Sequence, residues 1–115
     1  MIKTKRIYEP SSKDDGVRIL VMRFWPRGVR KNQVDLWYKG LGTEPDLIKA
    51  WKSGKIEWSD FKKKYLSYIR QVEHKPIIQE LAKRAKEESI TLLCSCEDES
   101  YCHRSILKSE IERYI

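Results

Sequence analysis

Most of the residues suited to chemistry stand together near the C-terminus, within residues 91–104. This segment holds all three cysteines of the chain, Cys94, Cys96 and Cys102, and also His103, one of only two histidines. Thiolates are nucleophiles and metal ligands, and an imidazole can transfer protons or bind a metal. We therefore expect any reactive site of the protein to lie in this segment.

Cys102 is the predicted nucleophile. The apolar pattern predicts a helix from about Cys102 to Tyr114, which places this thiol at a helix N-terminus. The partial positive charge there, together with the neighbouring His103 and Arg104, lowers a thiol pKa from about 8.5 toward neutrality. We expect His103 to be the proton partner of this thiol and Glu97 to be an orienting carboxylate.

Two other interpretations of the cysteines remain open. Cys96, Cys102 and His103 supply three zinc ligands, with Cys94 as a fourth, but their spacing differs from paired zinc motifs and adjacent residues rarely both reach one ion. Our first interpretation therefore has no metal ion and no other cofactor. A disulfide between Cys96 and Cys102 is the other interpretation, and it would act as a redox switch rather than as a structural link.

Basic residues after a second predicted strand offer a site for an anion. Residues 18–23 form a nearly continuous apolar run between two arginines, which is typical of a strand covered on both faces. Ligands of open parallel sheets bind beyond the carboxyl ends of the strands. We expect Arg23, Arg27 and Arg104 to hold an anion at that edge. Trp25 would line the same site or serve as a packing residue, and the first two arginines could instead pair with the acidic residues after the last strand.

The remaining pattern predicts one α/β domain that spans residues 1–115. Strands are predicted at residues 2–8, 18–23 and 90–94, a helical turn at 35–39, and helices at 43–52, from 58 to 72, from 76 to 85 and at 102–114. Long helical connections favour parallel strands. We therefore predict a small three-layer domain with a short, mostly parallel sheet flanked by helices. His74 falls in an interhelix turn, where we expect it to be exposed and without a role.

Composition narrows the classes of protein and of partner. The chain has 115 residues, a charged fraction of 36% and a net charge of +7, and its mean hydropathy is −0.67. No stretch approaches the roughly 18 apolar residues of a membrane span, and the N-terminus lacks the apolar segment of a secretory signal, so we expect a cytoplasmic protein without a membrane partner. The positive charge favours acidic partners, although a solvated surface explains spread-out basic residues equally well.

Several segments resemble a known family. The resemblance rests on Asp15-Gly16, Trp25-Pro26-Arg27-Gly28, Asp35-x-Trp37, Leu93-Cys94-x-Cys96-Glu97-Asp98 and Cys102-His103-Arg104, and it spans nearly the whole chain. These motifs are similar to those of the YeaO-like proteins, small α/β proteins in a domain-of-unknown-function family. The resemblance implies that the first two strands form a parallel pair. It also supports Arg23, Arg27 and the Cys-His-Arg segment as one shared group, but it implies no particular reaction.

Together these patterns predict an enzyme that binds a small anionic substrate, either phosphate-bearing or nucleotide-like. Arg23, Arg27 and Arg104 would hold the anion, and Cys102 would be the reactive thiol. Two alternatives belong to other classes. One is a non-catalytic module that binds nucleic acid through the positive charge of the chain. The other is a structural zinc domain or a redox-thiol domain.

Overall fold

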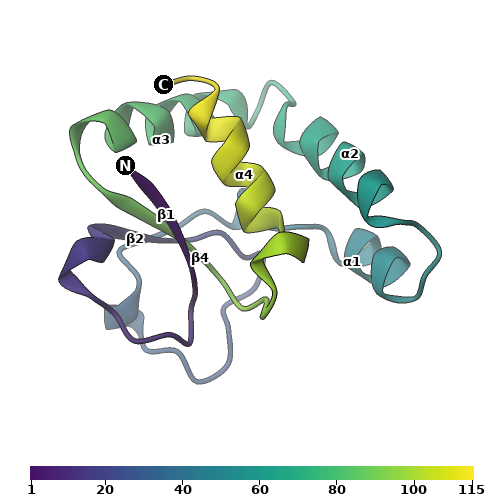
Figure 1. Ribbon diagram of the computed structural model, residues 1–115, viewed down its shortest axis with the longest axis horizontal. Coiled ribbons are helices and arrows are strands. Elements are labelled where there is room, and N and C mark those ends of the chain that lie inside the picture. The colour runs from purple at the N-terminus through teal and green to yellow at the C-terminus, as the bar shows by residue number, and fades with distance from the viewer.

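A four-stranded parallel sheet lies at the centre of the computed structural model, which describes residues 1–115 (Figure 1). The strands are β1 (Ile2–Arg6), β2 (Val17–Leu20), β3 (Leu36–Trp37) and β4 (Ile90–Cys94), and their order in the sheet is β1-β4-β2-β3. All three strand pairings are parallel. The predicted α/β domain with a parallel sheet is therefore confirmed.

The last strand in the sequence occupies the middle of the sheet. β4 pairs with β1 on one side and with β2 on the other, and all five of its residues are buried. This burial explains its unbroken apolar run, because a strand covered on both faces has no polar face to present. The first two strands are parallel, but they are not neighbours as the family resemblance implied, since β4 lies between them.

All four α-helices pack on one face of the sheet. They are α1 (Pro45–Lys52), α2 (Trp58–Ile69), α3 (Lys75–Glu87) and α4 (His103–Glu112). Their apolar residues join or contact a core that includes Ile19 and Leu92, and α3 and α4 are seen along one side of the strands in Figure 1. The opposite face carries Leu20 and Leu93, which are covered by residues between β2 and β3 such as Trp25. The third layer is therefore an irregular segment rather than a helix.

One predicted element has a different structure. Residues 35–39 were expected to form a helical turn, but Leu36 and Trp37 form the edge strand β3 and pair with Ile19 and Leu20. The indole N–H of Trp37 donates a hydrogen bond to the Met22 carbonyl at 2.7 Å. Contacts with a strand far away in the sequence therefore decide the conformation of this short segment, and a local pattern does not record them.

The other histidine also differs from the prediction. His74 is only 8% exposed, and its ring lies 4.6 Å from the ring of Tyr68. The last residue of the turn between α2 and α3 therefore packs against the protein, whereas Val72 in the same turn is 85% exposed. None of the helices is long and apolar enough to cross a membrane.

Candidate functional site: a cysteine–histidine cluster below a cavity

The ends of β2 and β4 meet at one edge of the sheet. These strands are parallel neighbours, and the Val21 N–H donates a hydrogen bond to the Leu93 carbonyl at 3.0 Å just beyond β2. α4 starts at the same edge, with Cys102 as its N-cap residue. The segment after β2 and the segment that holds the cysteines therefore finish side by side, as the parallel arrangement predicts.

Three cysteines and one histidine form a compact cluster at this edge. One side-chain atom of each of Cys94, Cys96, Cys102 and His103 lies within 4.8 Å of the others. The sulfur atoms of Cys94 and Cys96 are 3.5 Å apart. The Nδ1 atom of His103 is 3.8 Å from the sulfur of Cys94 and 3.9 Å from the sulfur of Cys102. All three cysteines are free thiols.

The orientation of His103 is set by a backbone carbonyl. Its Nε2 atom lies 2.6 Å from the carbonyl oxygen of Val21. Because a carbonyl oxygen only accepts hydrogen bonds, Nε2 carries a proton, and Nδ1 is the ring nitrogen that faces the sulfur atoms. The ring of Tyr65 packs edge-on against the imidazole at 5.4 Å, and its hydroxyl is held by the Leu41 carbonyl at 2.6 Å. The imidazole is therefore fixed on two sides with its basic nitrogen facing the cluster.

Arg104 brings a buried positive charge to the cluster. It is 3% exposed, and its Nη1 atom donates to the Cys96 carbonyl at 2.9 Å and approaches the sulfur of Cys102 at 3.8 Å. It belongs to none of the ion pairs in the protein. A buried cation without a countercharge is costly. Negative charge on the neighbouring sulfur atoms supplies that countercharge.

The thiols share their protons unequally. Hydrogen bonds from Cys102 and Cys96, aided by the charge of Arg104, hold the pKa of Cys94 well below its ordinary value. The pKa of Cys102 is raised, because its proton is held in hydrogen bonds to Cys94 and Cys96 and because burial disfavours a second negative charge. The cluster therefore holds one thiolate easily and resists a second.

A cavity of about 370 Å³ opens directly above the cluster. Its 16 lining residues include all four members of the cluster and three basic residues, Arg23, Lys49 and Lys52, but no carboxylate. The two lysines come from the last turn of α1, three positions apart and hence on one side of the helix. The chain therefore surrounds the reactive groups with positive charge alone.

Two polar atoms in the cavity wall have no partner. Nε of Arg23 and Oγ1 of Thr43 are buried without a hydrogen bond, and both residues line the cavity. The other end of Arg23 is fixed, because Nη2 donates to the Gly42 carbonyl at 3.3 Å and to the Tyr68 hydroxyl at 3.1 Å. Buried polar atoms usually have partners, so these two atoms indicate room for a polar ligand.

Gly42 allows this wall to form. A Cβ atom at this position would lie 2.2 Å from the backbone nitrogen of Arg23. The segment that carries Thr43 can therefore lie directly against the end of β2 only because residue 42 has no side chain.

Three of the predicted site residues lie elsewhere. Trp25 packs edge-on against Trp37 at 5.2 Å on the opposite face of the sheet. Arg27 is exposed, and its carbonyl accepts a hydrogen bond from Tyr8. The side chain of Glu97 is 88% exposed and lies 3.7 Å from Arg6. The structure thus groups Arg23, Cys102, His103 and Arg104, without these three.

The alternative of ion pairs at the strand ends is wrong for these arginines. Neither Arg23 nor Arg27 belongs to an ion pair. Sequence reasoning also missed the α1 side of the cavity. The spacing of Lys49 and Lys52 was a usable signal for one basic helix face, but no local pattern indicates that this face meets the cysteines.

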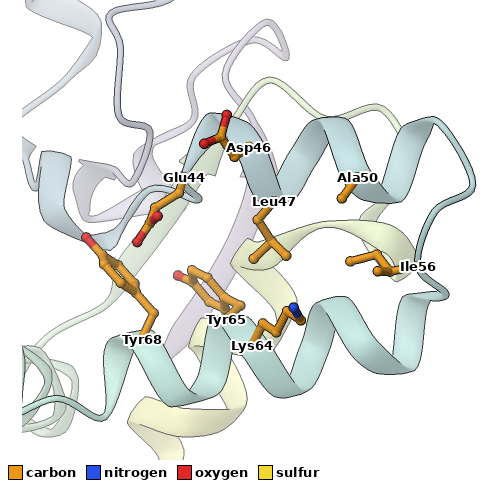
Figure 2. A pocket seen from close by; sticks show the side chains of 8 residues that line it. All are labelled: Glu44, Asp46, Leu47, Ala50, Ile56, Lys64, Tyr65 and Tyr68. Atoms are coloured by element: carbon orange, nitrogen blue, oxygen red, sulfur yellow. The ribbon is translucent and has the colours of Figure 1, made fainter.

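A second cavity, of about 280 Å³, lies between α1 and α2 (Figure 2). Both acidic and basic side chains line it, including Glu44, Asp46 and Lys64. It contains no member of the cysteine cluster. Tyr65 connects the two regions, since it lines this cavity and packs against His103. The first cavity is therefore the one that combines charge with reactive groups.

Comparisons with known proteins identify the family. The family model DUF488-N3a, described as "Active DUF488-N3 subclade", matches residues 2–114. "Uncharacterized protein YeaO" from Escherichia coli is 35% identical over 108 residues, which cover 92% of each chain. "Uncharacterized protein Rv3073c" from Mycobacterium tuberculosis is 25% identical over 108 residues, covering 92% of this chain and 89% of the relative. No solved structure matches the chain. The chain therefore belongs to the DUF488-N3a family, in agreement with its YeaO-like motifs.

Proposed function

We propose that the protein is an enzyme that binds a small anionic substrate in the cavity and brings it against a reactive sulfur of the cysteine cluster. The observation that carries this proposal is the composition of the cavity. Its lining combines three basic side chains, three thiols and an imidazole, without any carboxylate. The description of the matched family model calls its subclade active, which agrees with an enzyme but names no reaction.

The charge of the cavity favours an anion as the substrate. Lys49 and Lys52 are exposed at its rim, and Arg23 contributes the unpaired Nε at its wall. A concave surface that carries charge of one sign concentrates ions of the opposite sign. A phosphate or carboxylate group of the substrate would take its hydrogen bonds from these three side chains.

The aromatic residues of the cavity favour a planar group on the same substrate. Phe24 is 66% exposed and Tyr101 is 49% exposed, and both line the cavity. Trp51 stacks on Tyr101 with ring centroids 6.0 Å apart. Exposed ring faces stack on planar heterocycles whatever their sequence or pattern of substituents. A nucleotide-like molecule combines such a ring with the required negative charge.

The cluster supplies the chemistry in this proposal. Cys94 and Cys102 are the candidate reacting sulfurs, since both line the cavity and both face Nδ1 of His103. Cys94 would react as the thiolate that its neighbours stabilise, whereas His103 would accept the proton of Cys102 if that thiol reacts. In either case Arg104 balances the negative charge. Glu97 has no part in it, because a carbonyl oxygen already holds the other nitrogen of His103.

Protection from alkylation tests the proposed binding site. Reduced protein is treated with iodoacetamide after removal of metal ions, with and without inorganic pyrophosphate or AMP, and the rate of modification of each cysteine is followed by mass spectrometry. We expect both probes to slow modification, and AMP to protect more strongly because of its ring. Replacement of Lys49 and Lys52 by alanine should abolish the protection. A matched variant with Lys62 and Lys63 replaced, two exposed lysines of α2 outside the cavity, should keep it.

The reaction itself is tested with a panel of nucleotides and phosphorylated small molecules, whose products are detected by mass spectrometry. We expect turnover of at least one compound to be lost in Cys94→Ser or Cys102→Ser, while pyrophosphate binding by the same variants persists. Equal protection in the lysine variant and the wild type would show that the cavity is not the anion site. Turnover that survives replacement of every cysteine would remove the sulfur from the mechanism.

A further inference from the structure

We propose that Cys94, Cys96, Cys102 and His103 form a zinc site with three sulfur ligands and one nitrogen ligand. This inference does not rest on the proposed function, because the metal site is built from the geometry of the cluster alone. It replaces the first interpretation of the sequence, which had no metal.

The ligand atoms already have the spacing of a tetrahedral site. With Zn–S bonds of about 2.3 Å, two sulfur ligands of a tetrahedron lie about 3.8 Å apart, and a sulfur and an imidazole nitrogen lie about 3.5 Å apart. The corresponding distances here are 3.5 Å for Cys94 to Cys96, 3.8 Å for Cys94 to His103 and 3.9 Å for Cys102 to His103. All four atoms lie within 4.8 Å of one another. The three separations of 3.5–3.9 Å are already close to the tetrahedral values, and the widest pair has to close by about 1 Å to bind the ion.

The imidazole is held as a metal ligand requires. A ligating histidine usually donates its other N–H to a carbonyl or carboxylate, which fixes the tautomer and the ring orientation. Nε2 of His103 has such a partner in the Val21 carbonyl at 2.6 Å. In the neutral ring that a metal ion requires, the lone pair of Nδ1 is therefore directed at the space between the sulfur atoms.

The backbone explains how two adjacent residues can bind one ion. Cys102 is extended, with φ −135° and ψ 143°, whereas His103 is the first residue of α4. This change of conformation turns both side chains inward, and Cys102 and His103 are 1% and 6% exposed. Cys94 is the last residue of β4, and Cys96 lies two positions beyond it with its sulfur 3.5 Å from the sulfur of Cys94. The objection raised by the sequence spacing therefore does not apply to this fold.

The charges also fit a zinc complex. Three thiolates and a neutral imidazole around Zn²⁺ carry a net charge of −1, which the single positive charge of Arg104 balances. Thiolate-rich sites select soft or borderline ions such as Zn²⁺ over Mg²⁺ or Ca²⁺. No fifth ligand is needed, because the four protein ligands complete the coordination of the ion.

Metal binding would change what the cavity can do. With all three sulfurs bound to zinc, their negative charge is shared with the ion, so they react more slowly with alkylating agents and substrates, and the end of β4 is tied to the start of α4. With the ion removed, the cluster returns to the state with one thiolate. Bound zinc would therefore reversibly lower the reactivity of the thiols at the base of the cavity.

Direct binding of metal ions to the full-length reduced protein tests the site. Zinc is measured by elemental analysis after equilibrium dialysis, and Co²⁺ is used as a spectroscopic probe of tetrahedral thiolate coordination. We expect about one zinc per chain and intense sulfur-to-cobalt charge-transfer bands. Cys96→Ser and His103→Asn should weaken zinc binding by more than about 100-fold. His74→Asn, which replaces the other histidine at a place outside the cluster, should bind zinc like the wild type.

The outcomes separate this inference from the proposed function. Absence of zinc and of the cobalt bands in folded wild-type protein would overturn the metal site, a result that needs no variant. Wild-type affinity in the folded Cys96→Ser and His103→Asn variants would also overturn it, since the ion would then lie elsewhere. If pyrophosphate still protects the metal-free thiols in either case, the proposed function stands. If the protein binds zinc but anions do not slow alkylation of the thiols, the metal site stands and the proposed substrate site is refuted.

Discussion

A single carboxylate fixes the helix that carries the cluster, and its removal gives a quantitative test of the structure. Glu110 is 3% exposed and accepts two hydrogen bonds from Arg70 of the α2 C-terminus, at 2.9 and 3.0 Å. Arg113 donates a third hydrogen bond to it at 3.0 Å. These contacts join α4 to α2. We predict that Glu110→Gln loosens this junction without touching the cavity.

The expected loss is about 2 kcal/mol in the free energy of unfolding. Removing one partner of a fully buried ion pair costs about 3–5 kcal/mol, because a buried charge is left alone. Here the side chains of Arg70 and Arg113 are 46% and 59% exposed, so water can solvate them in the variant. Glutamine also keeps the volume and one acceptor oxygen. For 115 residues, an unfolding entropy of about 2.1 cal/mol/K per residue converts this loss to a decrease in Tm of about 8 °C.

The effect should depend on pH in a defined direction. Hydrogen bonds from Arg70, together with Arg113, lower the pKa of Glu110 below its ordinary value. A carboxyl group whose pKa is lower in the folded state stabilises the protein fully above the unfolded pKa, and this stabilisation is lost as the pH falls through the folded pKa. The difference between wild type and Glu110→Gln should therefore be constant near neutrality and shrink below about pH 4.

Urea unfolding at pH 7 and at pH 3, followed by circular dichroism, measures both effects. Glu112→Gln is the matched control, because Glu112 is exposed on the same helix and has no ion-pair partner. This control should change the unfolding free energy by less than about 0.5 kcal/mol. A loss in Glu110→Gln no larger than in the control, or a loss that grows on acidification, would refute the reasoning about this ion pair.

Three other changes have defined outcomes. Gly42→Ala should lower the free energy of unfolding in urea by about 3 kcal/mol, because the new Cβ would clash with the backbone of Arg23. Gly54→Ala should lower it by only about 1 kcal/mol, since Gly54 has φ 82° but open space around it. Equal losses would contradict the close approach of Gly42 to Arg23. Asp15→Asn should lower the free energy of unfolding by about 3 kcal/mol at pH 7, since the buried Arg18 loses its ion-pair partner. Because the pKa of Asp15 is lowered in the folded protein, this loss should become smaller in acid. A loss that does not depend on pH would argue against the ion pair as its cause. Arg104→Met should weaken zinc binding by about tenfold in equilibrium dialysis, and Arg104→Lys, which keeps the charge, should bind zinc more like the wild type. Unchanged binding by Arg104→Met would show that the positive charge of Arg104 does not stabilise the zinc complex.

Much of the fold could be predicted because the relevant forces are local. The apolar periodicity from Trp58 onward marks α2, whose buried residues include Phe61, Tyr65 and Ile69, and the run from Ile90 to Cys94 marks the central strand. In each case the spacing of apolar side chains is itself the cause of burial. β3 escaped prediction because only two residues pair, and they do so with β2 at the far side of a long connection.

Part of the candidate site could also be predicted from the sequence. The groups at the ends of β2 and β4 follow from parallel pairing. The orientation of His103 depends on the Val21 carbonyl, 82 positions away in the sequence, and tertiary packing brings two of the three basic side chains of the cavity from α1. Trp25 and Arg27 lie outside the site because the chain after Phe24 passes to the other face of the sheet. No local pattern contains these relationships.

The central position of β4 has a consequence for synthesis of the protein on the ribosome. β1 and β2 pair with β4 and not with each other, so the nascent chain carries two unpaired strand edges until β4 emerges. Closure of the sheet has to wait for β4, which follows the other three strands and three of the four α-helices in the sequence. Pairing between strands so far apart in the sequence is slow, and the early strands stay open to wrong pairing during that time.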